Sequence, residues 1–216
     1  MGNNEGKMII KFNNHYLEKL FENRPVTGKP KYANDVIRKF KKAVLKLQFA
    51  DNIRELRNFK GMNFEALKGE RKGFYSVRVD IHYRLILSVE ADRSVTVTEI
   101  LIIEDLSKHY QKNSHNMAEH KILNSKGKEI FTDVSLHPGE VLAMELEARG
   151  MRKSAFAENL GMKPSHFSEL LHSKRHISAA IALKLEKLLD IPAEYWMRIQ
   201  VYYDLFMERN KEAEAA

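Results

Sequence analysis

Cysteine is absent from this chain of 216 residues. Its absence excludes disulfide bonds, thiolate zinc sites and cysteine nucleophiles, and it is compatible with a reducing compartment. Long hydrophobic runs are also absent, since no apolar stretch approaches the roughly 20 residues that a membrane-spanning helix needs. The start of the chain leads into only a brief apolar patch. We therefore expect a cytoplasmic protein without a membrane partner.

An excess of basic residues is confined to the first half of the chain. The whole sequence holds 36 Lys and Arg against 29 Asp and Glu, which gives a net charge of +7. Residues 1–110 hold 21 basic against 14 acidic residues, whereas residues 111–216 hold 15 of each. A basic domain suggests a polyanion such as RNA as its partner, although many surfaces are modestly basic without one.

The first half has the residue pattern of an α+β domain. A strand is predicted within residues 7–13, followed by helices to about residue 23 and over about residues 34–50. The outer face of the second helix is expected to carry Arg38, Lys39, Lys41, Lys42 and Lys46. Three β-branched and aromatic runs at 73–80, 83–89 and 95–103 then predict an antiparallel meander. We expect the helices to pack on one face of this sheet.

That arrangement leaves the opposite sheet face to basic side chains. Arg78 belongs to this face, Lys68 and Arg71 lead into the meander, and Arg84 lies in its second strand. Such a cluster suits phosphate binding and the stabilisation of transition-state charge in phosphodiester cleavage. Exposed strand cations that deter edge-to-edge aggregation explain the same residues equally well.

Residues 152–171 predict a helix-turn-helix. Ala157 is small enough for the crossing of two helices, and Gly161 suits a turn with positive φ. The apolar residues of the second helix share one inward stripe, made by Phe167, Leu170 and Leu171. A small helical hairpin without DNA-binding function is the alternative, but all these offsets together favour DNA binding.

Polar residues on and beside the second helix are candidates for contacts to DNA. The residues expected to face base edges are Ser165, His166 and Glu169. The basic residues expected to hold phosphates are Arg152, Lys153, Lys174 and Arg175. Lys163 also belongs to this surface. It stands at the expected N-cap, so the start of the helix is expected to depend on Pro164.

Residues 111–136 are interpreted as a connector. Within it, residues 121–133 predict a small hairpin that is able to pair with an exposed strand edge of either domain. The histidines His109, His115 and His120 lie in a polar segment without helical i,i+4 pairing, so we expect no metal site. No cofactor is expected.

The remaining segments of the second half predict further helices. Pro138 suits a first helical position and Ser178 an N-cap. A last helix after Asp190 carries one apolar stripe, formed by Trp196, Ile199, Tyr203 and Phe206. The outer edge of that stripe is a candidate dimer surface.

Residues 66–85, with the sequence ALKGERKGFYSVRVDIHYRL, resemble the signature run of HigB-type toxins of the RelE/ParE superfamily. The resemblance covers about residues 7–110 and implies a small ribosome-dependent mRNA endonuclease. It implies that Lys68, Arg71, Arg78 and Arg84 face RNA, that His109 or Tyr110 moves a proton, and that the RNA's own 2′-hydroxyl attacks without a metal. Two departures are that Asp105 is separated from His109 and that Glu65 stands where some relatives carry histidine.

The segment 137–140, the helix-turn-helix and residues 193–205 together resemble HigA-type antitoxins of the XRE family. This resemblance covers about residues 133–206 and implies a homodimer that binds an inverted repeat in operator DNA.

The sequence therefore predicts a toxin domain at 1–110, a connector at 111–136 and an antitoxin domain at 137–216. We expect a fused toxin–antitoxin protein that represses its own transcription and contacts ribosomes and mRNA. The alternative is a DNA-binding regulator whose RelE-like half is catalytically inactive and serves as an interaction or dimerisation module.

Overall fold

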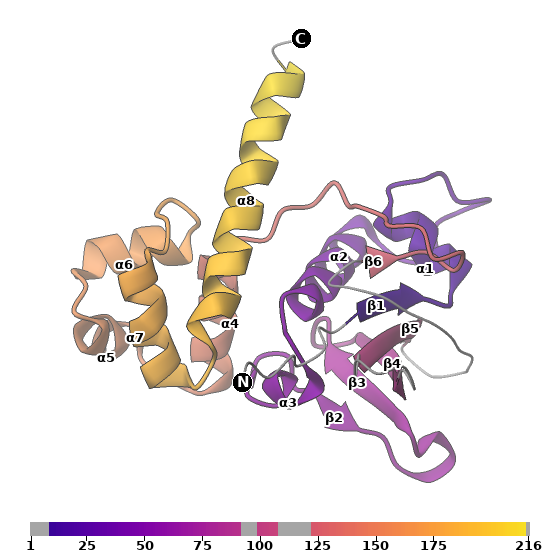
Figure 1. Ribbon diagram of the computed structural model, residues 1–216, viewed down its shortest axis with the longest axis horizontal. Coiled ribbons are helices and arrows are strands. Elements are labelled where there is room, and N and C mark those ends of the chain that lie inside the picture. Colours follow the sequence, from indigo (N-terminus) through magenta and orange to yellow (C-terminus); the bar gives the residue numbers. More distant parts are fainter. Residues whose placement is uncertain (1–8, 92–98, 108–121, 215–216) are drawn as a thin grey trace, which may run out of the picture. The chain divides into compact units, whose positions relative to one another are not determined.

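A computed structural model describes residues 9–91, 99–107 and 122–214 (Figure 1). The chain forms two compact units. Unit 1 comprises Met1–Arg57 and Met62–Val134, and unit 2 comprises Asn58–Gly61 and Ser135–Ala216. Within the described ranges, no helix has both the length and the apolar character needed to cross a membrane.

Unit 1 contains a six-stranded sheet in the order β2-β3-β4-β5-β1-β6 (Figure 1). The strands are β1 (Ile9–Phe12), β2 (Glu65–Ala66), β3 (Phe74–Arg78), β4 (Arg84–Ala91), β5 (Glu99–Ser107) and β6 (Ile122–Leu123). The antiparallel pairing of β3 with β4 and of β4 with β5 confirms the predicted meander. However, β1 pairs in parallel with both β5 and β6, so the complete sheet is mixed.

Three helices of unit 1 precede the meander: α1 (His15–Phe21), α2 (Asn34–Gln48) and α3 (Ile53–Leu56). Asn14 caps α1, because its side-chain oxygen accepts hydrogen bonds from the amides of Tyr16 and Leu17 at 3.0 and 3.2 Å. Helix α2 buries Phe40, Val44 and Leu47, as predicted.

The prediction that Lys41 lies on an exposed basic face of α2 is wrong. Lys41 is only 3% exposed, and its ammonium group donates to the carboxylate of Asp133. The buried face of α2 is broader than a single stripe, since Val36 and Leu45 are also buried. A lysine within that face needs an anion, and a segment 92 residues later in the sequence supplies it.

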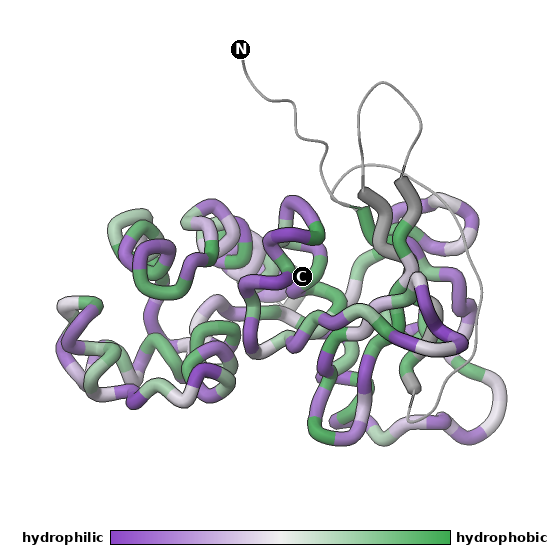
Figure 2. Tube along the Cα trace, turned by 90° about the horizontal axis from the view of Figure 1, so that it is seen from below, coloured by the Kyte–Doolittle hydropathy of each residue, from purple (hydrophilic) through white to green (hydrophobic). Residues whose placement is uncertain are grey.

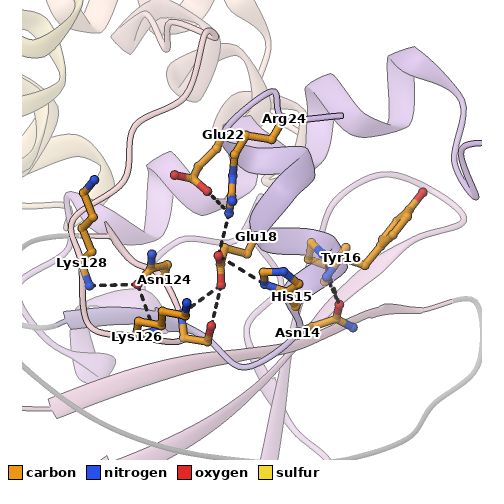
Figure 3. A network of polar contacts seen from close by, with 11 residues as sticks. Asn14, His15, Tyr16, Glu18, Glu22, Arg24, Asn124, Lys126 and Lys128 are labelled. Carbon is orange, nitrogen blue, oxygen red and sulfur yellow. Dashed lines mark hydrogen bonds and ion pairs between the residues drawn. The ribbon is translucent and has the colours of Figure 1, made fainter. Parts of the chain in front are cut away.

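The predicted hairpin is present after residue 121. Leu123 of β6 forms an antiparallel bridge with Glu129, and β6 extends the sheet at the edge offered by β1. Glu18 of α1 fastens this hairpin, because its Oε2 accepts from both the amide and the hydroxyl of Ser125 at 3.0 and 2.9 Å. Its Oε1 accepts from Arg24 at 2.7 Å (Figure 3). The carboxylate thus joins helix, loop and hairpin.

Unit 2 contains five helices in its described part: α4 (Pro138–Ala148), α5 (Lys153–Leu160), α6 (Pro164–Leu171), α7 (Ala179–Leu189) and α8 (Ala193–Glu214). Both hydrophobic and hydrophilic residues occur along the helices (Figure 2), and the buried positions recur at the spacing of amphipathic helices. Their shared core includes Leu142, Leu146 and Leu185, together with Trp196 and Ile199 of the predicted stripe in α8. In the same stripe, Tyr203 and Phe206 are half-buried.

Glu18 predicts how the stability of the protein depends on pH. Burial raises the pKa of Glu18, but hydrogen bonds from Ser125 and His15 outweigh it and hold the pKa below 4.5. A carboxyl with a lowered folded-state pKa adds stability above its unfolded pKa and loses it as the pH falls through the folded value. We expect Glu18→Gln to lower the free energy of unfolding at pH 7 by about 1–3 kcal/mol.

Urea unfolding at pH 7 and at a pH below the folded-state pKa of Glu18 measures this contribution. The difference between wild type and Glu18→Gln should shrink in acid, because both side chains are then uncharged. Glu129→Gln, at an exposed position of the same hairpin, should behave as wild type at both pH values. A Glu18→Gln deficit that is equal at both pH values would contradict this role of the charge.

Candidate nucleic-acid interfaces

Helices α5 and α6 form the predicted helix-turn-helix in unit 2. Gly161 ends α5 in the left-handed region at φ 69°, and the amide of Met162 returns to the carbonyl of Ala157 at 2.9 Å. Ala157 is 1% exposed, so its small side chain is enclosed within the unit. The rings of Phe156 and Phe167 lie 5.8 Å apart and pack the two helices against each other.

The outer surface of α6 is polar along the positions predicted to face DNA. Ser165 is exposed, and His166 and Glu169 are half-exposed, whereas Phe167 and Leu170 of the same helix are buried. Lys163 makes no side-chain cap to α6, and Pro164 occupies the start of the helix, as the sequence suggested. The N-terminal end of α6 therefore presents side-chain donors and acceptors on a fixed helical frame.

Glu169 is joined to Arg175 by two contacts. The guanidinium Nε and Nη2 of Arg175 lie 3.0 and 2.9 Å from the same carboxylate oxygen. The sequence assigned these residues to separate tasks, one at a base edge and one at a phosphate. Of the other predicted phosphate contacts, Arg152, Lys153 and Lys174 are all exposed.

Sequence reasoning missed the part that Gly139 plays in positioning α6. A β-carbon at Gly139 would lie 1.8 Å from the carbonyl oxygen of Leu170, so only glycine permits this approach of α4 to α6. The approach is set by a capping box at the start of α4, where His137 Nδ1 accepts from the Gly139 amide at 2.9 Å.

The predicted basic cluster of unit 1 centres on β3 and β4. Arg78 and Arg84 are directly opposite each other in the register of these strands, and Arg78 is exposed. Lys68 and Arg71 lie in the segment between β2 and β3, where Lys68 is exposed and Arg71 is half-buried in a short 3-10 turn. His109 and Tyr110 lie outside the described residues.

Arg84 is held by three partners that the sequence did not reveal. Its Nε donates to the Ser76 hydroxyl at 2.9 Å, and its Nη2 donates to the Asn63 carbonyl at 2.9 Å. Nη2 also lies 2.5 Å from a carboxylate oxygen of Glu65. Ser76 is opposite Glu65 across β2 and β3, so the sheet register itself brings these groups to the guanidinium. An anion that binds Arg84 has to share it with Glu65.

Within the described ranges, no group of three or more His, Asp or Glu side chains is placed to hold a metal ion. The cations at this surface of unit 1 are guanidinium and ammonium groups, which are suited to binding phosphate and neutralising its charge.

Comparison with known proteins assigns the two parts of the sequence separately. Residues 10–99 match the model of the RelE-like toxin of the type II toxin-antitoxin system HigB, and residues 142–196 match a helix-turn-helix model. Virulence-associated protein I of Dichelobacter nodosus is 36% identical over 81 residues, which are 37% of this chain and 75% of that protein.

Antitoxin HigA-1 of Vibrio cholerae is 35% identical over 79 residues, which are 36% of this chain and 74% of the antitoxin. Among solved structures, the Pseudomonas aeruginosa antitoxin HigA with the higBA promoter is 28% identical, covering 37% of this chain and 88% of that chain, with a TM-score of 0.35.

Gly139→Ala tests the fit of α4 against α6. Because the added methyl group would overlap the Leu170 carbonyl, we expect a loss of about 1–3 kcal/mol in the free energy of unfolding. DNA affinity should fall as well, since α6 has to shift. Denaturant unfolding and a mobility-shift titration measure the two effects, with Glu147→Ala at an exposed position of α4 as the control. Wild-type stability of Gly139→Ala would show that the approach is not required.

Proposed function

The chain belongs to the HigB–HigA toxin–antitoxin family and carries a HigB-like and a HigA-like part in one polypeptide. From this we propose that the protein binds its own operator through α5 and α6 and represses its own transcription. One observation carries the proposal. The glycine turn at Gly161 and the buried stripe of α6 leave Ser165, His166 and Glu169 on the outer surface of the second helix. That is the position from which a recognition helix contacts base edges.

The exposed basic residues around α5 and α6 suit the phosphates on either side of the groove. Arg152, Lys153 and Lys174 are placed to hold phosphates and set orientation, and Lys163 lies next to the start of α6. Arg175 holds the Glu169 carboxylate, so we assign it an orienting role as well as a phosphate contact. Glu169 then accepts from a cytosine amino group.

A homodimer fits an operator with an inverted repeat, because each subunit would contact one half-site. Val201 and Leu205 of α8 are 52% and 49% exposed and are four residues apart on one helical face. Burying these residues between two copies would remove apolar surface from water. The half-sites would then be centred about 34 Å, or a multiple of that distance, apart.

For the HigB-like part we propose ribosome-dependent cleavage of mRNA. Lys68, Arg71 and Arg78 would hold the RNA backbone, and Arg84 would stabilise charge that develops on the scissile phosphate. The RNA's own 2′-hydroxyl would attack the phosphorus and the bond to the 5′-oxygen would break, which leaves a 2′,3′-cyclic phosphate and a free 5′-hydroxyl. His109 or Tyr110 would take the proton from the 2′-hydroxyl or give one to the leaving 5′-oxygen. The contact between Arg84 and Glu65 favours a second candidate, in which this part is catalytically inactive and acts as an interaction or dimerisation module.

The operator proposal predicts different effects for two substitutions. Glu169→Ala should relax specificity at one base pair of each half-site, by roughly 1–3 kcal/mol. Arg152→Ala should instead weaken binding to all DNA sequences alike and reduce the slope of log affinity against log salt concentration by about one. Footprinting of the upstream DNA, followed by titration on operators with single base changes, measures both effects. The absence of any protected repeat would exclude operator binding.

The nuclease proposal is tested by expressing residues 1–134, which retain β6 and its contact to Glu18. We expect growth arrest, and we expect Arg84→Ala to relieve it through an approximately 100- to 1,000-fold lower cleavage rate. Arg38→Ala, at an exposed position of α2, should leave the arrest unchanged. If the fragment is folded by circular dichroism and both growth and ribosome-associated mRNA stay intact, the inactive module is the correct alternative.

A further inference from the structure

Four residues of the HigB-like sequence belong to the compact unit that contains the helix-turn-helix. The HigB model covers residues 10–99, yet Asn58–Gly61 lie in unit 2, while Arg57 and Met62 on either side lie in unit 1. Each of the four residues makes a hydrogen bond or a ring contact within unit 2.

Phe59 is the apolar anchor of the segment. It is 1% exposed, and its ring centroid lies 4.4 Å from that of Tyr195, which is itself fully buried at the start of α8. Paired aromatic rings at this distance combine burial with a favourable ring geometry.

Glu145 of α4 binds the backbone that follows Phe59. Its Oε2 accepts from the amide of Lys60 at 3.0 Å, and its Oε1 accepts from the amide of Gly61 at 2.9 Å. The residue is 0% exposed, and burial raises the pKa of Glu145 although the amide of Gly61, the guanidinium of Arg149 and the amide of Lys60 lower it. Without the segment this carboxylate would lose two of its donors, at a substantial desolvation penalty.

Arg149 and Asn58 complete the polar contacts. Arg149 donates from Nη2 to the carbonyl of Asn58 at 2.7 Å and from Nε to Glu145 at 3.2 Å. The amide side chain of Asn58 donates to the carbonyl of Asp190 at 2.9 Å. The backbone of the segment is thus bound by an acid and a base that also contact each other.

Gly61 sets the size limit of the site. A β-carbon there would lie 2.7 Å from Cγ of Met144 and 3.0 Å from Oε1 of Glu145. Lys60, by contrast, is exposed and contributes its amide. A side chain at position 61 would therefore require Met144 and Glu145 to shift.

We propose that the HigA-like part contains a receptor for the Phe59-Lys60-Gly61 segment of the HigB-like part, formed by Glu145, Arg149, Met144 and Tyr195, and that this receptor keeps the two parts associated when the chain between them is cut. The proposal is independent of operator binding, since none of these residues lies on the outer surface of α6.

The test uses the full chain with a protease recognition sequence inserted between Val134 and Ser135, so that β6, its hairpin and Asp133 all stay with the HigB-like fragment. After cleavage, size-exclusion chromatography at micromolar concentration reports whether the two fragments elute together. We expect the cleaved wild type to remain associated, and we expect Phe59→Ala and Lys60→Pro to raise the dissociation constant about 10- to 100-fold. Lys60→Ala keeps the backbone amide and should have the dissociation constant of the wild type. The difference between Lys60→Pro and Lys60→Ala therefore reports the contribution of the backbone N–H of residue 60.

Separation of the cleaved wild type, or association of Phe59→Ala and Lys60→Pro as tight as that of the wild type, would overturn the proposal. Circular dichroism before cleavage shows whether each variant is folded. If the variants are unfolded, a peptide spanning residues 56–63 is added in excess to the cleaved wild type instead. It should separate the two fragments, whereas the same peptide with Phe59→Ala should not. An equal effect of the two peptides would overturn the proposal. Operator binding, measured in parallel, reports separately on the DNA-binding function.

Discussion

The buried carboxylate of Glu145 is the constraint on which much of unit 2 depends. An ionised group without access to water is tolerated only when hydrogen-bond donors surround it, and here they come from α4 itself and from a segment 84 residues earlier in the chain. Helix α4 also meets α6 at Gly139, where no β-carbon fits. Helix α4 thus binds a segment of the HigB-like sequence near its C-terminal end and packs against α6 at its start.

Both candidate nucleic-acid interfaces have a key charged side chain already paired within the protein. Arg84 contacts Glu65, and Arg175 contacts Glu169. Arg84 also donates to Ser76 and Asn63, so an anion at Arg84 would have to share it with Glu65. The Arg175–Glu169 pair has two partly exposed partners and contributes little stability. A base or phosphate bound at Glu169 or Arg175 would meet side chains that are already held in position, which lowers the entropy lost on binding.

Local sequence patterns were sufficient for the meander, the helix-turn-helix and the hairpin, because each depends on neighbouring residues. The left-handed turn at Gly161 and the start of α6 at Pro164 are examples. Patterns within one segment carry no information on which distant group meets which. The parallel pairing of β1 with β5, the burial of Lys41 against Asp133 and the contacts of Arg84 and Glu145 were therefore missed.

Hydrogen exchange at the amides of Lys60 and Gly61 in the intact protein tests most directly whether this segment is part of the HigA-like unit. Both amides donate to a carboxylate that has no exposed surface. They should therefore exchange only when unit 2 opens, with protection similar to that of the core amides of α4. Exchange at the rate of an unstructured peptide, while the amides of α4 remain protected, would contradict the account.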